Sequence, residues 1–144
     1  MPQGVAIQGA GLGLRRECLP DLLPRLAQAN SGSLRFVELA PENWANLGGR
    51  FARDLDAVAA HLPFALHGLS LSLGGSDALD MRLLRDTKAL MQKYAISLYT
   101  EHLSWCAHEG QLYDLLPLPC TDEAVRHVAT RISVVQDFLG QRIG

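Results

Sequence analysis

Four short apolar segments alternate with amphipathic helical patterns along this chain, and this alternation restricts the folds open to it. The segments are GVAIQGA (4–10), LRFVELA (34–40), FALHGLS (64–70) and ISLYTEHLS (96–104). They recur about every 30 residues, a spacing typical of strand–helix–strand units in which neighbouring strands are parallel. The sequence therefore predicts an α/β fold built on a parallel sheet.

Amphipathic helices are predicted after each of these strands. Asp21 is expected to cap the first helix and to leave Pro24 in its first turn. Thr121 suits the N-cap of the last helix, and Gly140 suits its C-terminal end. The apolar faces are formed by Leu19, Leu22, Leu23 and Leu26; Phe51, Leu55, Val58, Ala59 and Leu62; Leu83, Leu84, Thr87, Leu90, Met91 and Tyr94; and Val125, Val128, Ala129, Ile132, Val135 and Leu139.

Such strand–helix units also build the TIM-type (β/α)8 barrel, which usually needs about 250 residues. Because this chain has 144 residues, we interpret residues 1–144 as a single domain, the amino-terminal half of a barrel. The chain stops at QRIG, where a fifth strand is expected, so it is predicted to be truncated. Its outer strands would keep open edges that favour self-association. Val5, Val37, Leu66 and Leu98, or their strand neighbours, are expected on the inward face without the opposing strands.

Charge and composition exclude several classes of function. The net charge is −2 and no block of Lys or Arg occurs, so nucleic acid and anionic membranes are not expected partners. No apolar run approaches the ~20 residues that a membrane-spanning helix needs, and no secretion signal is recognisable. The cysteines, Cys18, Cys106 and Cys120, show no CxxC spacing, so we expect a cytoplasmic protein without a disulfide framework.

Polar residues gather where the predicted strands end, and sites of parallel sheets lie at the carboxyl ends of strands. His67 follows the third strand, and Glu101 and His102 follow the fourth. Neighbouring strands lie about 4.8 Å apart, so the two imidazoles could reach one metal ion. The residues alone leave open whether they are metal ligands or hydrogen-bonded core histidines. The long connection 105–121 is of a length often associated with function.

Glu38 and Asn43, near the end of the second predicted strand, are further candidates. Glu38 could support a site or form a salt bridge with Arg15 or Arg35. Asn43 could support a site or only turn the chain after Pro41. The residues leave both alternatives open.

Five motifs occur in a fixed order: GAGLGLR, FVELAPENW, LHGLSLSLG, EHLSW and DLLPLPCTDEAVRHVATRISVVQDFLG. In this order they resemble the multinuclear non-heme iron-dependent oxidase family, which includes the methanobactin oxazolone-forming enzyme and many uncharacterised proteins. The resemblance implies a (β/α)8 barrel with two or three iron ions at the carboxyl ends of its strands. It also implies an oxidase that uses dioxygen to modify cysteines of ribosomally made peptides, with the precursor peptide recruited through a partner protein.

The same resemblance implies roles for individual residues. His67 corresponds to the iron ligand of the family's HG-S motif, and His102 to that of its EH-S motif. Glu101 precedes the second ligand and is expected to orient it, with Glu38 and Asn43 as further supporting residues. The Glu-Asn motif of the family's fifth strand and its later Asp, His and Glu ligands have no counterpart here. We therefore expect a partial iron site and no activity of this chain by itself.

Two alternatives remain beside this interpretation. One is another metal-dependent (β/α)8 enzyme, of the sugar isomerase or endonuclease type. The other is a non-catalytic half-barrel fragment that binds a partner.

Overall fold

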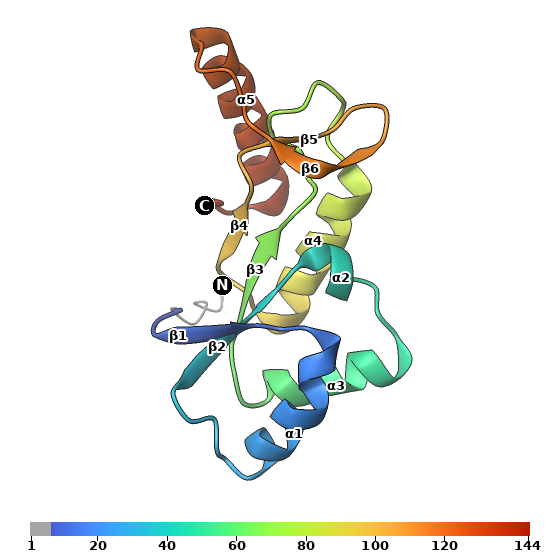
Figure 1. Ribbon diagram of the computed structural model, residues 1–144, viewed down its shortest axis with the longest axis vertical. Coiled ribbons are helices and arrows are strands. Elements are labelled where there is room, and N and C mark those ends of the chain that lie inside the picture. The colour runs from blue at the N-terminus through green and yellow to red at the C-terminus, as the bar shows by residue number, and fades with distance from the viewer. Residues whose placement is uncertain (1–6) are drawn as a thin grey trace.

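The central feature of the computed structural model, which describes residues 7–144, is a sheet of four strands. The strands are β1 (Ala10–Gly13), β2 (Leu34–Leu39), β3 (Phe64–Gly68) and β4 (Tyr99–Glu101), and they lie in this order. Each neighbouring pair is parallel, with Val37 opposite Phe64 and Leu66 opposite Tyr99 (Figure 1). The predicted α/β class and the parallel strand order are confirmed.

Helices follow the strands as the sequence predicts. They are α1 (Leu19–Ala27), preceded by the 3-10 turn η1 (Arg16–Cys18); the short α2 (Pro41–Trp44); α3 (Gly49–Ala59); α4 (Met81–Tyr94); and α5 (Asp122–Leu139). Thr121 caps α5, because its side chain accepts a hydrogen bond from the Ala124 N–H, and Gly140 ends the helix with a φ of 79°. Among the described residues, no helix is long and apolar enough to cross a membrane.

One face of the sheet carries the hydrophobic core. Val37 and Leu39 of β2 and Leu66 of β3 are almost fully buried, and they pack with apolar residues of α1, α3, α4 and α5. Burying such a side chain contributes about 1.5–3 kcal/mol. The helices α1 and α3 contact each other, as do α4 and α5, and the Tyr94 hydroxyl of α4 donates to Asp56 of α3 at 2.7 Å. The helices therefore cover the same face of the sheet.

The opposite face of the sheet, here called the inner face, carries the alternate residues. Because side chains alternate along a strand, Phe36 and Glu38 of β2, Ala65 and His67 of β3 and Thr100 of β4 share this face. The sequence left open whether Val37 and Leu66 or their strand neighbours lie here; the neighbours do, whereas Val37 and Leu66 belong to the helix-covered core. Leu98 is 38% exposed, as expected for the inward face, and Val5 lies outside the described residues.

The first strand and the first helix differ from the prediction. Within the described residues, the strand occupies the glycine-rich Ala10–Gly13 rather than 4–10. Gly11 is required there, because a Cβ would lie 2.2 Å from the Phe36 ring of β2. The helix begins at Leu19 rather than after Asp21, since proline suits a first turn, and Pro24 consequently lies inside it.

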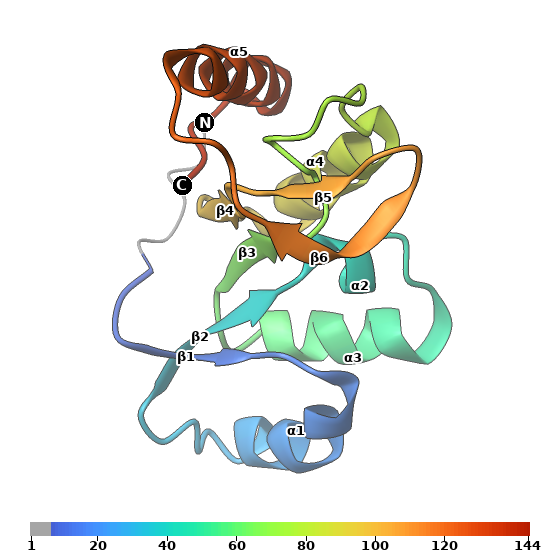
Figure 2. The same cartoon turned by 45° about the horizontal axis from the view of Figure 1, so that its top comes forward.

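The long connection after β4 is not a loop but an antiparallel hairpin. It contains β5 (Trp105–Ala107) and β6 (Gln111–Leu116), which form a separate two-stranded sheet. The hairpin lies over the carboxyl ends of β3 and β4 (Figure 2). Beyond it, Val125 of α5 is 66% exposed and Ala129 is exposed as well, so the predicted apolar stripe is buried only in part.

The outer edge of β4 is partly occupied by the end of the chain. The Gly144 N–H donates to the Tyr99 carbonyl at 3.0 Å, and the Gly144 carbonyl accepts from the Glu101 N–H at 3.0 Å. Bonds to the residues on either side of Thr100 are the pattern of a parallel bridge. The edge of β4 is therefore less open than the sequence suggests.

Candidate functional site

Two histidines predicted as metal ligands meet on the inner face at the carboxyl ends of β3 and β4. His67 lies in β3 opposite Thr100, and His102 follows the last residue of β4. The centroids of their rings are 4.5 Å apart, with the ring planes at 62°. Both side chains are partly exposed, so an ion or a substrate can reach them.

Hydrogen bonds hold both rings at Nδ1. His67 Nδ1 lies 2.7 Å from the Thr100 hydroxyl oxygen, which can donate or accept. His102 Nδ1 lies 3.0 Å from the Gly68 carbonyl, which can only accept. The neutral ring of His102 therefore carries its proton on Nδ1 and a lone pair on Nε2. Among residues 7–144, neither Nε2 makes a hydrogen bond.

Glu101 lies on the helix-covered face of the sheet, opposite the inner face, and supports His102 from there. Its carboxylate accepts from the His102 backbone N–H at 3.0 Å and from the Tyr99 hydroxyl at 2.7 Å. The side chain is 8% exposed and occupies space that a Cβ on Gly68 would take, since that atom would lie 1.9 Å from Oε2. The lack of a side chain at Gly68 therefore leaves the space that the Glu101 side chain occupies.

The pKa of Glu101 is raised to about 7, mainly by burial and also by the charge of the nearby Glu42, against the lowering effect of its two hydrogen bonds. Burial also raises the pKa of Tyr99, with the adjacent Glu101 charge acting in the same direction. A buried carboxyl whose pKa lies near neutrality is common at functional sites and also occurs in structural networks.

The other predicted residues lie at different places. Glu38 is exposed on the inner face, the same face as His67, and among the described residues it forms no ion pair with Arg15 or Arg35. Asn43 lies in α2, where its backbone carbonyl accepts from Arg16, and no hydrogen bond within residues 7–144 joins its side chain to either imidazole.

The sequence alone assigned no role to Glu42. Oε1 accepts hydrogen bonds from the N–H groups of Leu69 and Ser70 and from the Ser70 hydroxyl, at 2.8–2.9 Å. These bonds tie α2 to the segment that follows His67. An acidic residue directly after a strand was the available signal, because such positions meet at one edge of a parallel sheet.

The two histidines form only part of a metal centre. Within the described part of the chain, no group of three or more His, Cys, Asp or Glu side chains is placed to hold an ion. Two imidazoles held at Nδ1 nevertheless suit iron and other first-row metals, because the Nδ1 hydrogen bonds orient the rings. The two imidazole donors are therefore compatible with iron.

The fold and the paired histidines define an α/β protein with its candidate site at the carboxyl ends of parallel strands. Residues 9–144 match the model of the RiPP precursor modification enzyme family MbnB/TglH/ChrH, where RiPP denotes a ribosomally made, modified peptide. The chain belongs to this family. The resemblance seen in the sequence is confirmed.

Proteins similar to the chain occur in several bacteria. A UPF0276 protein of Haemophilus influenzae and one of Pasteurella multocida are each 53% identical to the chain over 137 residues, covering 95% of it and 44% of their own length. A UPF0276 protein of Neisseria gonorrhoeae is 50% identical over 137 residues and is covered to 48%. The chain therefore spans about half the length of the curated relatives it matches.

Proposed function

We propose that this chain supplies two imidazole ligands to the iron site of an oxidase that modifies cysteines of ribosomally made peptides with dioxygen. The observation that carries the proposal is the arrangement of His67 and His102. Their rings are in contact, and both Nδ1 atoms are engaged, so both Nε2 atoms remain for a metal. The family's description as a precursor modification enzyme supports a peptide substrate.

In this proposal each neighbouring residue has a defined task. Thr100 and the Gly68 carbonyl orient the imidazoles, and Glu101 holds the backbone at His102. Bound iron would supply the electron and dioxygen chemistry that amino-acid side chains lack. Because only two ligands are present here, the remaining donors for the two or three ions of the full-length protein come from outside the described residues.

The wider features of the proposal follow the family. Residues 1–144 form one domain corresponding to half of a (β/α)8 barrel, which the parallel sheet with its one-sided helices supports. The enzyme acts in the cytoplasm and receives its peptide through a partner protein. Glu38 would support the site from the inner face, and Asn43 from α2.

Binding of Ni²⁺ tests the histidine pair, because imidazole sites bind Ni²⁺ more tightly than Fe²⁺. Equilibrium dialysis would compare the chain with His67→Asn, His102→Asn and the matched control His61→Asn, which alters an exposed histidine that precedes β3 rather than lying at the carboxyl ends of the strands. We expect either site variant to weaken binding at least tenfold, since both rings contribute, and the control to leave it unchanged. Equal binding by all variants would refute the proposed ligands.

A second measurement tests the chemistry. In a full-length relative loaded with iron, the same two substitutions should abolish dioxygen uptake in the presence of a precursor peptide. The 144-residue chain alone is expected to show no such uptake. Unchanged iron content and activity in the full-length variants would contradict the proposal.

A further inference from the structure

A cavity of about 770 Å³ opens at the carboxyl ends of the strands, beside the candidate metal site in the chain. Its walls come from the segment 69–80, the β5–β6 hairpin, α2 and Arg131 of α5. Leu69 and Ser70, which closely follow His67, line it, as does the buried Cys106. The function proposed above assigns no role to this space.

The second strand of the hairpin, β6, borders the cavity. The first strand, β5, is held by Ser72, whose hydroxyl accepts hydrogen bonds from the N–H groups of Cys106 and Ala107 at 3.0 and 3.1 Å. Within residues 7–144, β6 pairs only with β5, so its other edge has no partner strand, and the Leu115 N–H donates to the Asp114 carboxylate at 2.8 Å. Leu112, Leu115 and Leu116 of β6 are 40%, 45% and 39% exposed. A free edge with apolar side chains is suited to an added, extended segment.

The cavity wall carries an excess of negative charge. Among the described residues, its only cation is Arg131, whose guanidinium already donates to the Asp77 and Ser72 carbonyls at 2.7 and 3.1 Å. Glu42 contributes a buried Oε2 atom for which the described residues provide no hydrogen-bond partner. The acidic side chains of the wall are Glu42, Asp77, Asp80 and Asp114. A positively charged group would complement them.

We propose that the free edge of β6 and the cavity beneath it form the docking site of the substrate peptide. The peptide adds to β6 as an extended strand, and a lysine or arginine side chain enters the acidic cavity. This inference rests on the proposed function only in taking a peptide as the substrate. It requires neither iron nor dioxygen, so it can be tested apart from the proposed chemistry.

The test measures binding of short fluorescent peptides by anisotropy, at low salt and with a chelator present. One probe alternates serine and valine around a central lysine, and a matched probe carries glutamate there. We expect the lysine probe to bind about tenfold more tightly than the glutamate probe, as for a charge-assisted contact. Equal binding of both probes, or no binding of either, would overturn the proposal.

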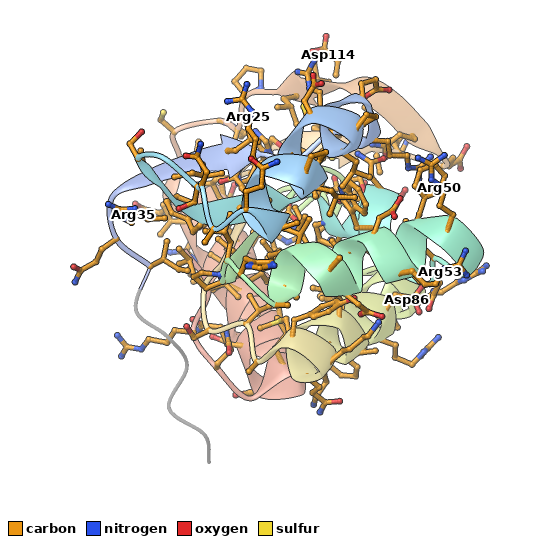
Figure 3. The ribbon with its side chains drawn as sticks, turned by 90° about the horizontal axis from the view of Figure 1, so that it is seen from below. Arg25, Arg35, Arg50, Arg53, Asp86 and Asp114 are labelled. Carbon is orange, nitrogen blue, oxygen red and sulfur yellow. The ribbon has the colours of Figure 1, made fainter. Side chains whose placement is uncertain are left out.

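Two pairs of variants locate the site. Asp114→Asn should reduce the preference for lysine severalfold, whereas Asp86→Asn, on α4 across the molecule from the hairpin (Figure 3), should not. Leu115→Ser should weaken both probes, whereas Val134→Ser, at an equally exposed position of α5 (45%), should not. Circular dichroism checks that each variant is folded, and a second Leu115 change, to Ala, replaces the serine variant if that one unfolds.

Two further outcomes would overturn the proposed docking site. Binding unaffected by Asp114→Asn and Leu115→Ser would place the peptide elsewhere and overturn the proposal. A chain that forms dimers in sedimentation experiments, and loses them with Leu115→Ser, would show that a second copy occupies the edge of β6 and would overturn it too. Ni²⁺ binding by the same preparations reports on His67 and His102, so failure of the docking site and failure of the metal site are distinguishable.

Discussion

Replacing Glu101 by Gln should stabilise the chain at neutral and alkaline pH. The carboxyl is 8% exposed, and burial raises its pKa from 4.5 to about 7. Between these two values the folded chain binds a proton that the unfolded chain has lost, so the free energy of unfolding falls as the pH rises. The loss begins above pH 4.5 and is complete above pH 7, because the carboxylate is then charged in both states.

The size of the effect follows from the pKa difference. A shift from 4.5 to about 7 corresponds to about 3 kcal/mol. A glutamine side chain has a similar volume without the charge, and it would still accept the hydrogen bond that Glu101 receives from the His102 N–H. At pH 5 we therefore expect the variant and the wild type to differ little, and at pH 8 we expect the variant to be more stable by about 3 kcal/mol.

Urea unfolding at several pH values, followed by circular dichroism with a chelator present, would measure this difference. Glu17→Gln serves as the matched control, because Glu17 is exposed and its variant should follow the wild type at every pH. A constant difference between Glu101→Gln and the wild type from pH 5 to pH 8 would refute the reasoning. So would a variant less stable than the wild type at pH 8.

Two further substitutions test the packing around the site. Gly68→Ala should destabilise the fold by about 2 kcal/mol, because its Cβ would lie 1.9 Å from Glu101 Oε2, whereas Gly13→Ala meets nothing within 4 Å and should have a much smaller effect. Leu84→Ala, at a fully buried position of α4, should cost about 3 kcal/mol, and Val125→Ala, at a position 66% exposed, should change stability by less than about 0.5 kcal/mol. Urea midpoints would check both pairs, and equal midpoints within either pair would contradict the packing described here.

The parallel sheet could be predicted because local and global signals agree. Strands such as Phe64–Gly68 are short and mostly apolar, and the helices between them have single apolar stripes, a combination typical of a parallel sheet packed against helices. Thr121 and Gly140 marked the ends of α5 correctly, since caps depend on nearby backbone groups.

The misplaced features depend on contacts between segments far apart in the sequence. The glycine-rich Ala10–Gly13 reads as a loop until the Phe36 ring of β2 is placed over Gly11. The hairpin after β4 depends on Ser72, whose hydroxyl binds the backbone of β5 from another loop. Pattern analysis of a single segment contains neither contact.

The candidate site was predictable in part. His67 and His102 were placed together because parallel strands end at one edge of a sheet, and their ring contact agrees with that argument. The hydrogen bonds that join their Nδ1 atoms to Thr100 and to the Gly68 carbonyl could not be predicted, because each depends on the exact register of β3 and β4. The position of Glu101 on the helix-covered face, by contrast, follows from alternation along β4 and was open to prediction.

The pairing of Gly144 with β4 has a practical consequence for how the chain is handled. Gly144 runs parallel to β4 with Thr100 opposite it, so a residue joined after Gly144 would continue toward His102. A strand advances about 3.3 Å per residue, and the second added residue would thus lie level with that histidine. A polyhistidine purification tag fused directly to Gly144 would bring foreign imidazoles beside the very pair whose metal binding is to be measured. A cleavable tag at the amino terminus would keep the tag's imidazoles out of that measurement.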